Sequence, residues 1–195
     1  MEMVKHQIQA KRGQTVMILP IGDIQWAGDE HEVATRLLMD TIEYGVKHQA
    51  YFIGMGDYID VLSPSNRERL TSAALYDTAK GFLDRSASDL VQDLYERFLK
   101  PATGRFLGCV EGHHFFKYEA GHTSDQELCH LLKTKHLGSC AYIGLAFMDG
   151  TKRLGTVNIW VHHGSGSGNS AAAPVQKLES YVYGEWEADI YIIGH

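Results

Sequence analysis

The chain has 195 residues, 44% of them hydrophobic, and a formal net charge of −6 with the histidines counted as neutral. This length suits one domain that needs no disulfide bonds for stability, and we expect a single domain over residues 1–195. The negative charge argues against a broad surface for duplex nucleic acid. No apolar run approaches the ~18 residues of a membrane span, and the N-terminus has no signal-peptide core, so the expected location is cytoplasmic, with no membrane partner.

The first two thirds of the chain alternate predicted strands and helices. Short apolar runs predict buried strands, and apolar residues at helical spacing predict helices. Asp29 is a candidate N-cap for the first helix, and Ser124 with Glu127 forms a candidate capping box for the last. The predicted elements are a strand at 16–22, a helix at 29–48, a strand at 50–55, a largely helical polar region at 63–104, a strand at 105–110 and a helix at 124–136.

Strands dominate the last third. Two of them, 141–148 and 156–161, are joined through Asp149-Gly150, which is a hairpin signal. A Gly/Ser-rich loop at 164–170 precedes a helix from Pro174, and a buried strand follows at 188–193. Because strands and helices alternate first and strands then cluster, we predict an α/β fold with mixed sheets.

Three cysteines occur, at positions 109, 129 and 140. Their odd number and the absence of a C-x-x-C spacing argue against a disulfide framework and against a structural zinc site. We expect three free thiols in a reducing compartment.

Five predicted strands end beside an aspartate or a histidine. Each ending alone is a common turn, so only their combination is informative. In α/β sheets ligands gather at the carboxyl ends of strands, and glycine permits the sharp exit of the chain there. Carboxylate and imidazole groups together suit Mn, Fe, Zn or Ni better than Ca. The five endings, which would form a site for two divalent cations, are Gly22-Asp23, Gly56-Asp57, Gly112-His113, His163-Gly164 and Gly194-His195.

In order and spacing, these endings resemble the signature of the calcineurin-like metallophosphoesterase superfamily, which reads D-x-H, G-D-x-x-D, G-N-H-D/E, H-G and G-H-x-H. The resemblance spans 17–195 and is closest to a phage-associated and prokaryotic branch, which would place a phage-encoded protein in the host cytoplasm. It implies a four-layer fold, in which a two-sheet mixed β sandwich is flanked by helices. The matching blocks are Asp23-Ile24-Gln25, Gly56-Asp57-Tyr58-Ile59-Asp60, Gly112-His113-His114-Phe115, His163-Gly164 and Gly194-His195.

Carried over residue by residue, the resemblance implies two divalent metal ions, Mn foremost, with Fe, Zn, Ni or Mg as alternatives. His114 takes the position of the catalytic histidine, and Asp60 that of the carboxylate that orients it. The implied metal ligands are Asp57 as the bridge, Asp23 and Gln25 for the first ion, and His113, His163 and His195 for the second.

The sequence departs from the family pattern at several positions. Gln25 stands in place of a histidine, and an amide oxygen is a poorer ligand for transition metals than imidazole. His113 replaces an asparagine, which keeps a ligand, and Phe115 replaces an acidic residue. The family's last block continues beyond its first histidine, so the end at His195 leads us to expect a chain truncated at its C-terminal end.

The expected function is metal-dependent hydrolysis of phosphate esters, with a phosphodiester substrate such as nucleic acid or a nucleotide favoured over a monoester. A phosphomonoesterase is one alternative. Another is a non-catalytic or single-metal module of the same fold that serves in partner binding, and Gln25 favours it. The oligomeric state stays open.

Several residues near these blocks have both a functional and a structural interpretation. Trp26 either lines the cleft and stacks on a base or packs in the core. The loop at 164–169 either holds phosphate through its N–H groups or is a flexible connection. Neighbouring His162 and His163 face opposite sides of a strand, and we favour His163 as the ligand. His122 and Asp125 are expected to be capping and surface residues.

Overall fold

The computed structural model describes residues 2–29, 35–61, 76–164, 173–182, 184 and 187–194. Three of its strands, β2 (Ile18–Ile21), β3 (Tyr51–Gly54) and β4 (Phe106–Cys109), form a parallel sheet in that order. Each lies inside a strand predicted from an apolar run. Almost every residue of β3 and β4 is buried, as expected for parallel strands covered on both faces.

A second, mixed sheet has the order β1-β5-β6-β7, from β1 (Glu2–Gln9), β5 (Cys140–Asp149), β6 (Lys152–His162) and β7 (Ile190–Ile193). Strands β5 and β6 form the predicted antiparallel hairpin, and β1 and β7 join its two sides in parallel. Strand β1 was not predicted. Its sequence is mostly polar because it lies at the edge of the sheet, where only Val4 and Ile8 are buried.

Four α-helices accompany the sheets within the described residues: α1 (Thr35–Lys47), α3 (Asp77–Leu94), α4 (Ser124–Leu131) and α5 (Ala173–Val182). Helix α3 continues through a π-helical turn, η1 (Tyr95–Leu99), and a 3-10 turn, η2 (Lys100–Ala102). The predicted helix cap at Asp29 adjoins residues 30–34, and the predicted helical region at 63–104 begins within residues 62–75. Both of these segments lie outside the described residues.

The capping box of α4 was predicted one residue too late. The cap is Thr123, whose hydroxyl accepts the Gln126 N–H at 3.3 Å, while the Gln126 side chain accepts the Thr123 N–H at 3.0 Å. The helix also ends at Leu131 rather than at residue 136, and Lys133 then takes a left-handed conformation with φ 56°. This shift places Asp125 inside the first turn, where its side chain turns toward the protein interior.

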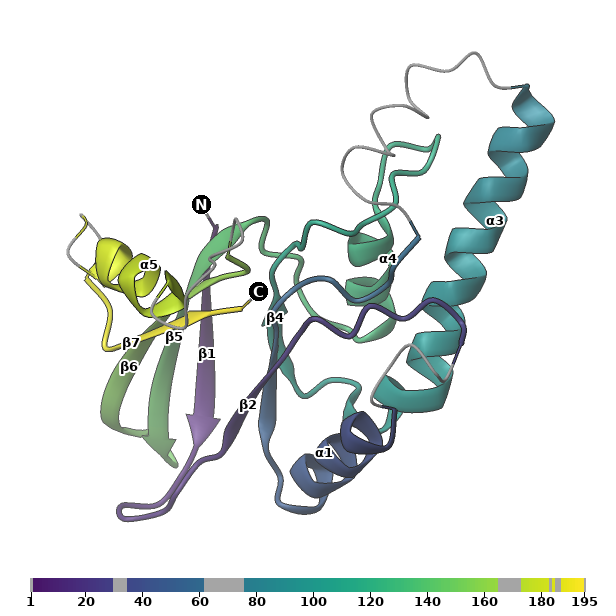
Figure 1. Cartoon of the computed structure of the whole chain (residues 1–195). Helices are drawn as coiled ribbons and strands as arrows, with labels where there is room; N and C mark the ends of the chain where they lie inside the picture. The colour runs from purple at the N-terminus through teal and green to yellow at the C-terminus, as the bar shows by residue number, and fades with distance from the viewer. Residues whose placement is uncertain are drawn as a thin grey trace.

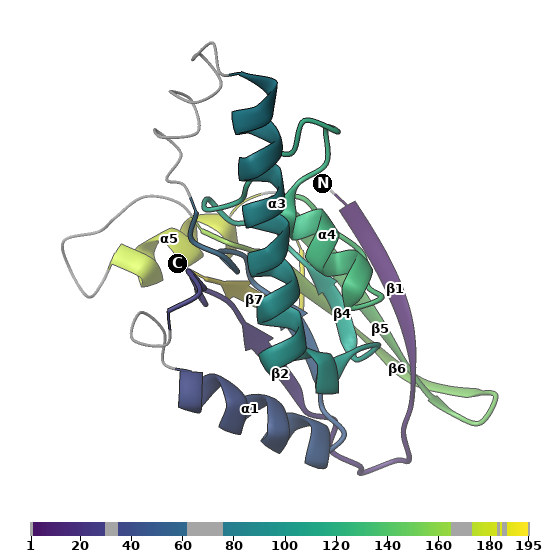
Figure 2. The same ribbon diagram turned by 90° about the vertical axis from the view of Figure 1, so that its right-hand side faces the viewer.

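The two sheets pack face to face over an apolar core drawn from both, including Val4, Ile53, Leu107, Ile143 and Val161. A second core joins the three-stranded sheet to the helices. Figure 2 shows α3 crossing the face of that sheet, with α1 and α4 beside it. In Figure 1, α5 lies on the far side of the four-stranded sheet from these helices. The expected two-sheet α/β architecture flanked by helices is therefore observed.

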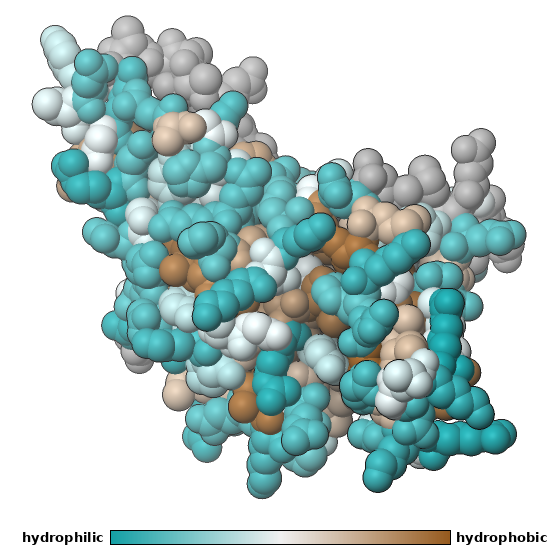
Figure 3. All heavy atoms as spheres, turned by 180° about the vertical axis from the view of Figure 1, so that it is seen from behind, coloured by the Kyte–Doolittle hydropathy of each residue, from teal (hydrophilic) through white to brown (hydrophobic). Residues whose placement is uncertain are grey.

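The described surface carries scattered rather than continuous apolar areas. Figure 3, which views the molecule from behind, shows hydrophobic side chains in small groups separated by hydrophilic ones. Among the described helices, none combines the length and apolarity needed to cross a bilayer.

Candidate metal centre

The loops that follow β2, β3 and β4 leave the three-stranded sheet side by side. Beyond the strands, the Asp23 N–H donates to the Gly56 carbonyl at 3.0 Å, and the Gln25 N–H donates to the Asp57 carbonyl at 2.9 Å. The Val110 N–H donates to the Gly54 carbonyl at 2.9 Å. The carboxyl end of the sheet thus brings three sequence-distant loops together, as the strand endings predicted.

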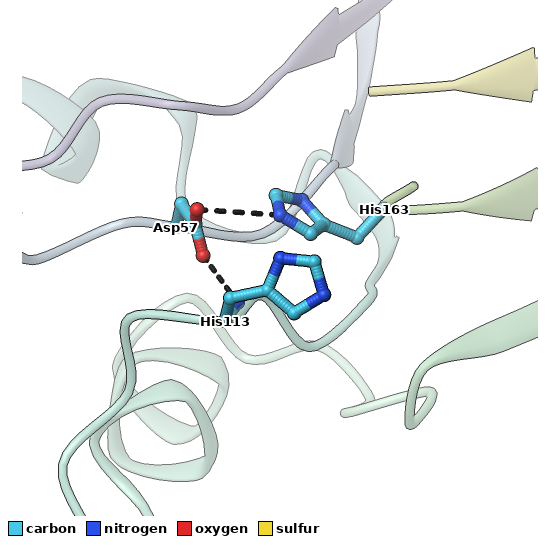
Figure 4. Close-up of side chains that lie close together, drawn as sticks. All are labelled: Asp57, His113 and His163. Carbon is cyan, nitrogen blue, oxygen red and sulfur yellow. Dashed lines mark hydrogen bonds and ion pairs between the residues drawn. The ribbon is translucent and has the colours of Figure 1, made fainter. Parts of the chain in front are cut away.

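Asp57, His113 and His163 converge at this edge, from the loops after β3, β4 and β6 (Figure 4). One potential ligand atom from each lies within 4.8 Å of the other two. The side chains of Asp57 and His163 are almost fully buried, and His113 is half-buried. The two imidazole rings meet edge to face with centroids 4.7 Å apart. One carboxylate and two imidazoles therefore face a common point.

The Asp57 carboxylate is held on one oxygen only. Its Oδ1 accepts the N–H groups of His113 and His114, the latter at 2.9 Å. Its Oδ2 is buried and accepts no hydrogen bond from any described residue, although it lies 3.2 Å from Nε2 of His163. A buried carboxylate oxygen without a hydrogen-bond donor is costly, and a cation would offset that cost.

The tautomer of His163 is set by Nδ1, the ring nitrogen that does not face Asp57. Nδ1 donates to the Met55 carbonyl at 2.6 Å, so in the neutral ring Nε2 carries the lone pair on the side of Asp57. Burial lowers the pKa of His163, but the Asp57 carboxylate and the Met55 carbonyl outweigh it and raise that pKa above its usual value. Burial likewise raises the pKa of Asp57, yet the His163 ring and the His114 and His113 amides hold it well below its usual range. The anionic carboxylate and a backbone-anchored imidazole are the arrangement of a metal-binding pair.

Two glycines allow the loops to approach so closely. A Cβ on Gly112 would lie 2.1 Å from both the amide nitrogen and Oδ1 of Asp57. Gly56 has φ +93°, and a Cβ there would lie 2.7 Å from Nδ1 of His163. The loops that carry Asp57 and His113 therefore pack backbone against backbone.

We expect Gly112→Ala to destabilise the protein by about 3 kcal/mol or more, because overpacking against backbone atoms cannot be relieved by a side-chain rotation. Urea unfolding with a chelator present measures this effect. Gly155→Ala is the matched control, because a Cβ there meets no atom within 4 Å and its φ is not positive. Equal stability of the two variants would contradict the close packing at Gly112.

Three residues of the site have an uncommon backbone conformation. Asp23, Gln25 and Asp57 lie in the left-handed region, with φ of 50°, 51° and 52°. This region is strained for residues other than glycine and is found preferentially where function fixes the backbone. The resemblance implies that all three bind a metal, but Gln49 and Lys133 share the conformation without such a role.

The donor set fits a divalent metal ion. Asp57, His113 and His163 supply one carboxylate and two imidazoles, which suit Mn, Fe, Zn or Ni. Asp23 and Gln25 lie outside this group, with exposed side chains, although the Asp23 charge is close enough to raise the pKa of His163. The described residues thus gather three of the six expected ligands, and His195 lies outside the described residues.

His114 and Asp60 form a hydrogen-bonded pair next to the metal ligands. Nδ1 of His114 lies 2.9 Å from Oδ1 of Asp60, and both side chains are partly exposed, at 25% and 44%. Donation from Nδ1 to the carboxylate leaves Nε2 of His114 for a bound molecule. The pair has the geometry that its expected roles require, and the roles themselves stay a prediction.

The structure also resolves two of the open interpretations. His162 lies in β6 with its ring stacked on Trp160 and its Nδ1 accepting the Gly164 N–H at 2.7 Å, and it does not belong to the group of Asp57, His113 and His163. Trp26 is fully buried, and its Nε1–H donates to Oδ2 of Asp93 at 3.0 Å. The interpretation that Trp26 stacks on a base is therefore wrong. The possible phosphate-holding loop falls almost entirely on residues 165–172, outside the described residues.

Asp125 is the residue that sequence reasoning misplaced. We expected a surface position, but its side chain is 1% exposed and Oδ2 accepts the Gly112 N–H at 3.2 Å. Burial raises the pKa of Asp125 to about 6, against the opposite effect of the Gly112 hydrogen bond. No local sequence pattern predicts the burial of Asp125, because that burial depends on contact with the loop that precedes the helix.

The raised pKa of Asp125 predicts a pH-dependent stability. The folded state binds the Asp125 proton more tightly than the unfolded state does. The contribution of this proton to folding stability is therefore fully present below about pH 4 and is lost as the pH rises through 6. The shift in the Asp125 pKa corresponds to about 3 kcal/mol of folding free energy. We expect Asp125→Asn, measured by urea unfolding with a chelator, to gain that stability relative to the wild type between pH 4 and 7. Parallel pH profiles of the two proteins would contradict the assignment.

Comparisons with protein families, with curated proteins and with solved structures give no match for this chain. The site is therefore interpreted from its own residues and geometry.

Proposed function

We propose that the protein is a metal-dependent hydrolase of phosphate esters, of the calcineurin-like metallophosphoesterase kind. The observation that carries this proposal is the convergence of Asp57, His113 and His163 next to the hydrogen-bonded His114 and Asp60. The first three residues suit a divalent cation, and the last two suit proton transfer. A bound cation and a neighbouring proton-transfer group together would support hydrolysis of a phosphate ester.

Each residue has a distinct task in this proposal. Asp57, His113 and His163 would hold a divalent ion, Mn foremost, with His195 as a further candidate ligand, and Asp23 and Gln25 would hold a second ion that Asp57 bridges to the first. Bound ions of this kind supply positive charge to the phosphoryl oxygens and lower the pKa of water toward neutrality. The Met55 carbonyl holds the His163 ring, and the amides of His113 and His114 hold the Asp57 carboxylate, so that little reorganisation is needed.

His114 would move the proton of the reaction. Asp60 fixes its Nδ1–H, so Nε2 is the atom directed to the substrate, where it gives a proton to the leaving oxygen or stabilises charge on the phosphoryl group. Both residues are more exposed than Asp57 and His163, as contact with a substrate demands.

A phosphodiester is the favoured substrate class, by analogy with phage-type members of the family. Purified protein should hydrolyse bis-p-nitrophenyl phosphate when Mn is added and lose that activity with a chelator. The p-nitrophenyl monoester, assayed in parallel, should react more slowly. Preference for the monoester would identify a phosphomonoesterase, and hydrolysis of neither ester would overturn the proposed function.

One observation favours a second candidate, a single-metal module that binds a partner without catalysis. The described residues bring together one three-ligand group, and Gln25 and Asp23 are exposed outside it. Elemental analysis of protein purified without chelator or histidine tag separates the candidates. Two equivalents of metal per chain support the hydrolase, whereas one equivalent without hydrolysis supports the module.

A further inference from the structure

Asp125 is a buried carboxylate with no part in the proposed chemistry. It lies in the first turn of α4 and is 1% exposed, in a fold where burial of a charge costs free energy unless partners compensate it. Its Oδ2 accepts the Gly112 N–H at 3.2 Å, and its Oδ1 accepts the Ser124 hydroxyl at 3.4 Å. The helix does not need this carboxylate as a cap, because Thr123 and Gln126 form the capping box.

Gly112 lies between two carboxylates. On one side Asp57 is so close that a Cβ on Gly112 would lie 2.1 Å from its Oδ1, and on the other side the Gly112 N–H donates to Asp125. The next two amides, of His113 and His114, donate to Oδ1 of Asp57. Asp125 therefore holds the first amide of the same loop whose next two amides hold Asp57.

We propose that Asp125 is a positioning residue of the metal centre: by holding the Gly112 amide, it fixes the His113 ring and the His114 side chain relative to Asp57. The inference rests on the proposed function, because it assumes that Asp57, His113 and His163 bind a metal. It adds a residue that touches neither the ligands nor a substrate, and that acts through one backbone hydrogen bond.

The hydrogen bond, rather than the charge, is the feature that positions the loop. Asn at this position keeps a carbonyl oxygen for the Gly112 N–H and removes the charge, whereas Ala removes both. Loss of a group that hydrogen-bonds to a metal ligand typically weakens metal affinity by about 10–100-fold, and we expect an effect of that order here because Gly112 directly precedes His113. A residue that only stabilises the fold would leave the affinity and the ligand geometry of the folded protein unchanged.

The test is a Co²⁺ titration of the metal-free full chain, followed by visible absorption, which reports both affinity and ligand geometry. We expect Asp125→Ala to bind Co²⁺ about 10–100-fold more weakly than the wild type, with an altered band shape. Asp125→Asn should restore wild-type affinity and band shape. Glu127→Gln is the control, because Glu127 is on the same helix but accepts hydrogen bonds from the side chains of Ser88 and Tyr118 and none from Gly112, and it should bind as the wild type.

Wild-type affinity and spectrum in Asp125→Ala would overturn the inference, as would an Asp125→Asn variant that binds as weakly as Asp125→Ala. If Asp125→Ala does not fold, Asp125→Ser takes its place, because its shorter side chain does not reach Gly112, and amide hydrogen exchange at Gly112 reports the lost bond directly. A wild type that binds Co²⁺ without hydrolysing phosphate esters contradicts the hydrolase and leaves this inference standing. A wild type that binds no metal overturns both.

Discussion

Asp57→Asn is expected to abolish metal binding and hydrolysis and to lower the stability of the metal-free protein at neutral pH. The change removes a buried negative charge that the fold favours, because the effect of burial on the pKa of Asp57 is outweighed by the His163 ring and the His114 and His113 amides, which lower that pKa. The affinity should fall by more than about 100-fold, since loss of even an outer partner costs ~10–100-fold. Isothermal titration with Mn or Zn measures the loss.

The hydrogen bonds that the substituted side chain of this variant can still make should limit its loss of stability. The amide oxygen still accepts the His113 and His114 N–H groups, and the new NH₂ group can donate to Nε2 of His163, 3.2 Å from the present Oδ2. Thermal unfolding with a chelator tests this expectation. Asp40→Asn, at an exposed position of α1, is the control and should change neither property. Retained metal binding in Asp57→Asn would contradict the assignment of Asp57 as a ligand.

His114→Ala is expected to lower kcat for phosphodiester hydrolysis by about 10²–10⁴-fold, the usual contribution of a general acid or base. Metal content should stay that of the wild type, because the group of ligands does not include this side chain. Asp60→Asn should lower kcat less, since it weakens the orientation of His114 without removing it. Steady-state kinetics and elemental analysis of the same preparations provide both measurements.

His122→Ala is the matched control for this prediction. His122 is exposed, and its ring lies against Tyr118 rather than in the metal centre. Its loss should leave kcat unchanged. If His114→Ala retained full activity, or lost its metal together with its activity, the proton-transfer role would be wrong.

The strands that the sequence predicted best are those with the simplest environment. β3 and β4 are covered on both faces, so their continuous apolar runs identify them directly. β1 has one face and one edge exposed, and its alternating pattern is interrupted by His6, whose Nε2 bonds to the Leu107 carbonyl at 2.7 Å. That inward polar residue is satisfied by a strand a hundred residues away, which local patterning does not reveal.

The candidate site was predictable where it depends on strand ends. Asp57 and His113 follow neighbouring parallel strands whose carboxyl ends meet at one edge, so their convergence could be expected before the structure, whereas His163 follows a strand of the second sheet. Asp125 could not, because its burial depends on how α4 is oriented against the Gly112 loop. The one-residue error in the cap of α4 had the same origin, since Ser124 accepts the Phe116 N–H at 2.9 Å instead of capping its own helix.

The position of β1 in its sheet has a consequence for the order of folding. Glu2 pairs with Ala141, so β1 cannot pair with its neighbour until β5 has been synthesised. The strand pairings of the three-stranded sheet involve no residue beyond Cys109 and can form earlier. Because distant pairings are slow to form, we expect the half of the site with Asp57 and His113 to assemble first during translation. His163 would then complete the metal centre only when the second sheet closes over the first.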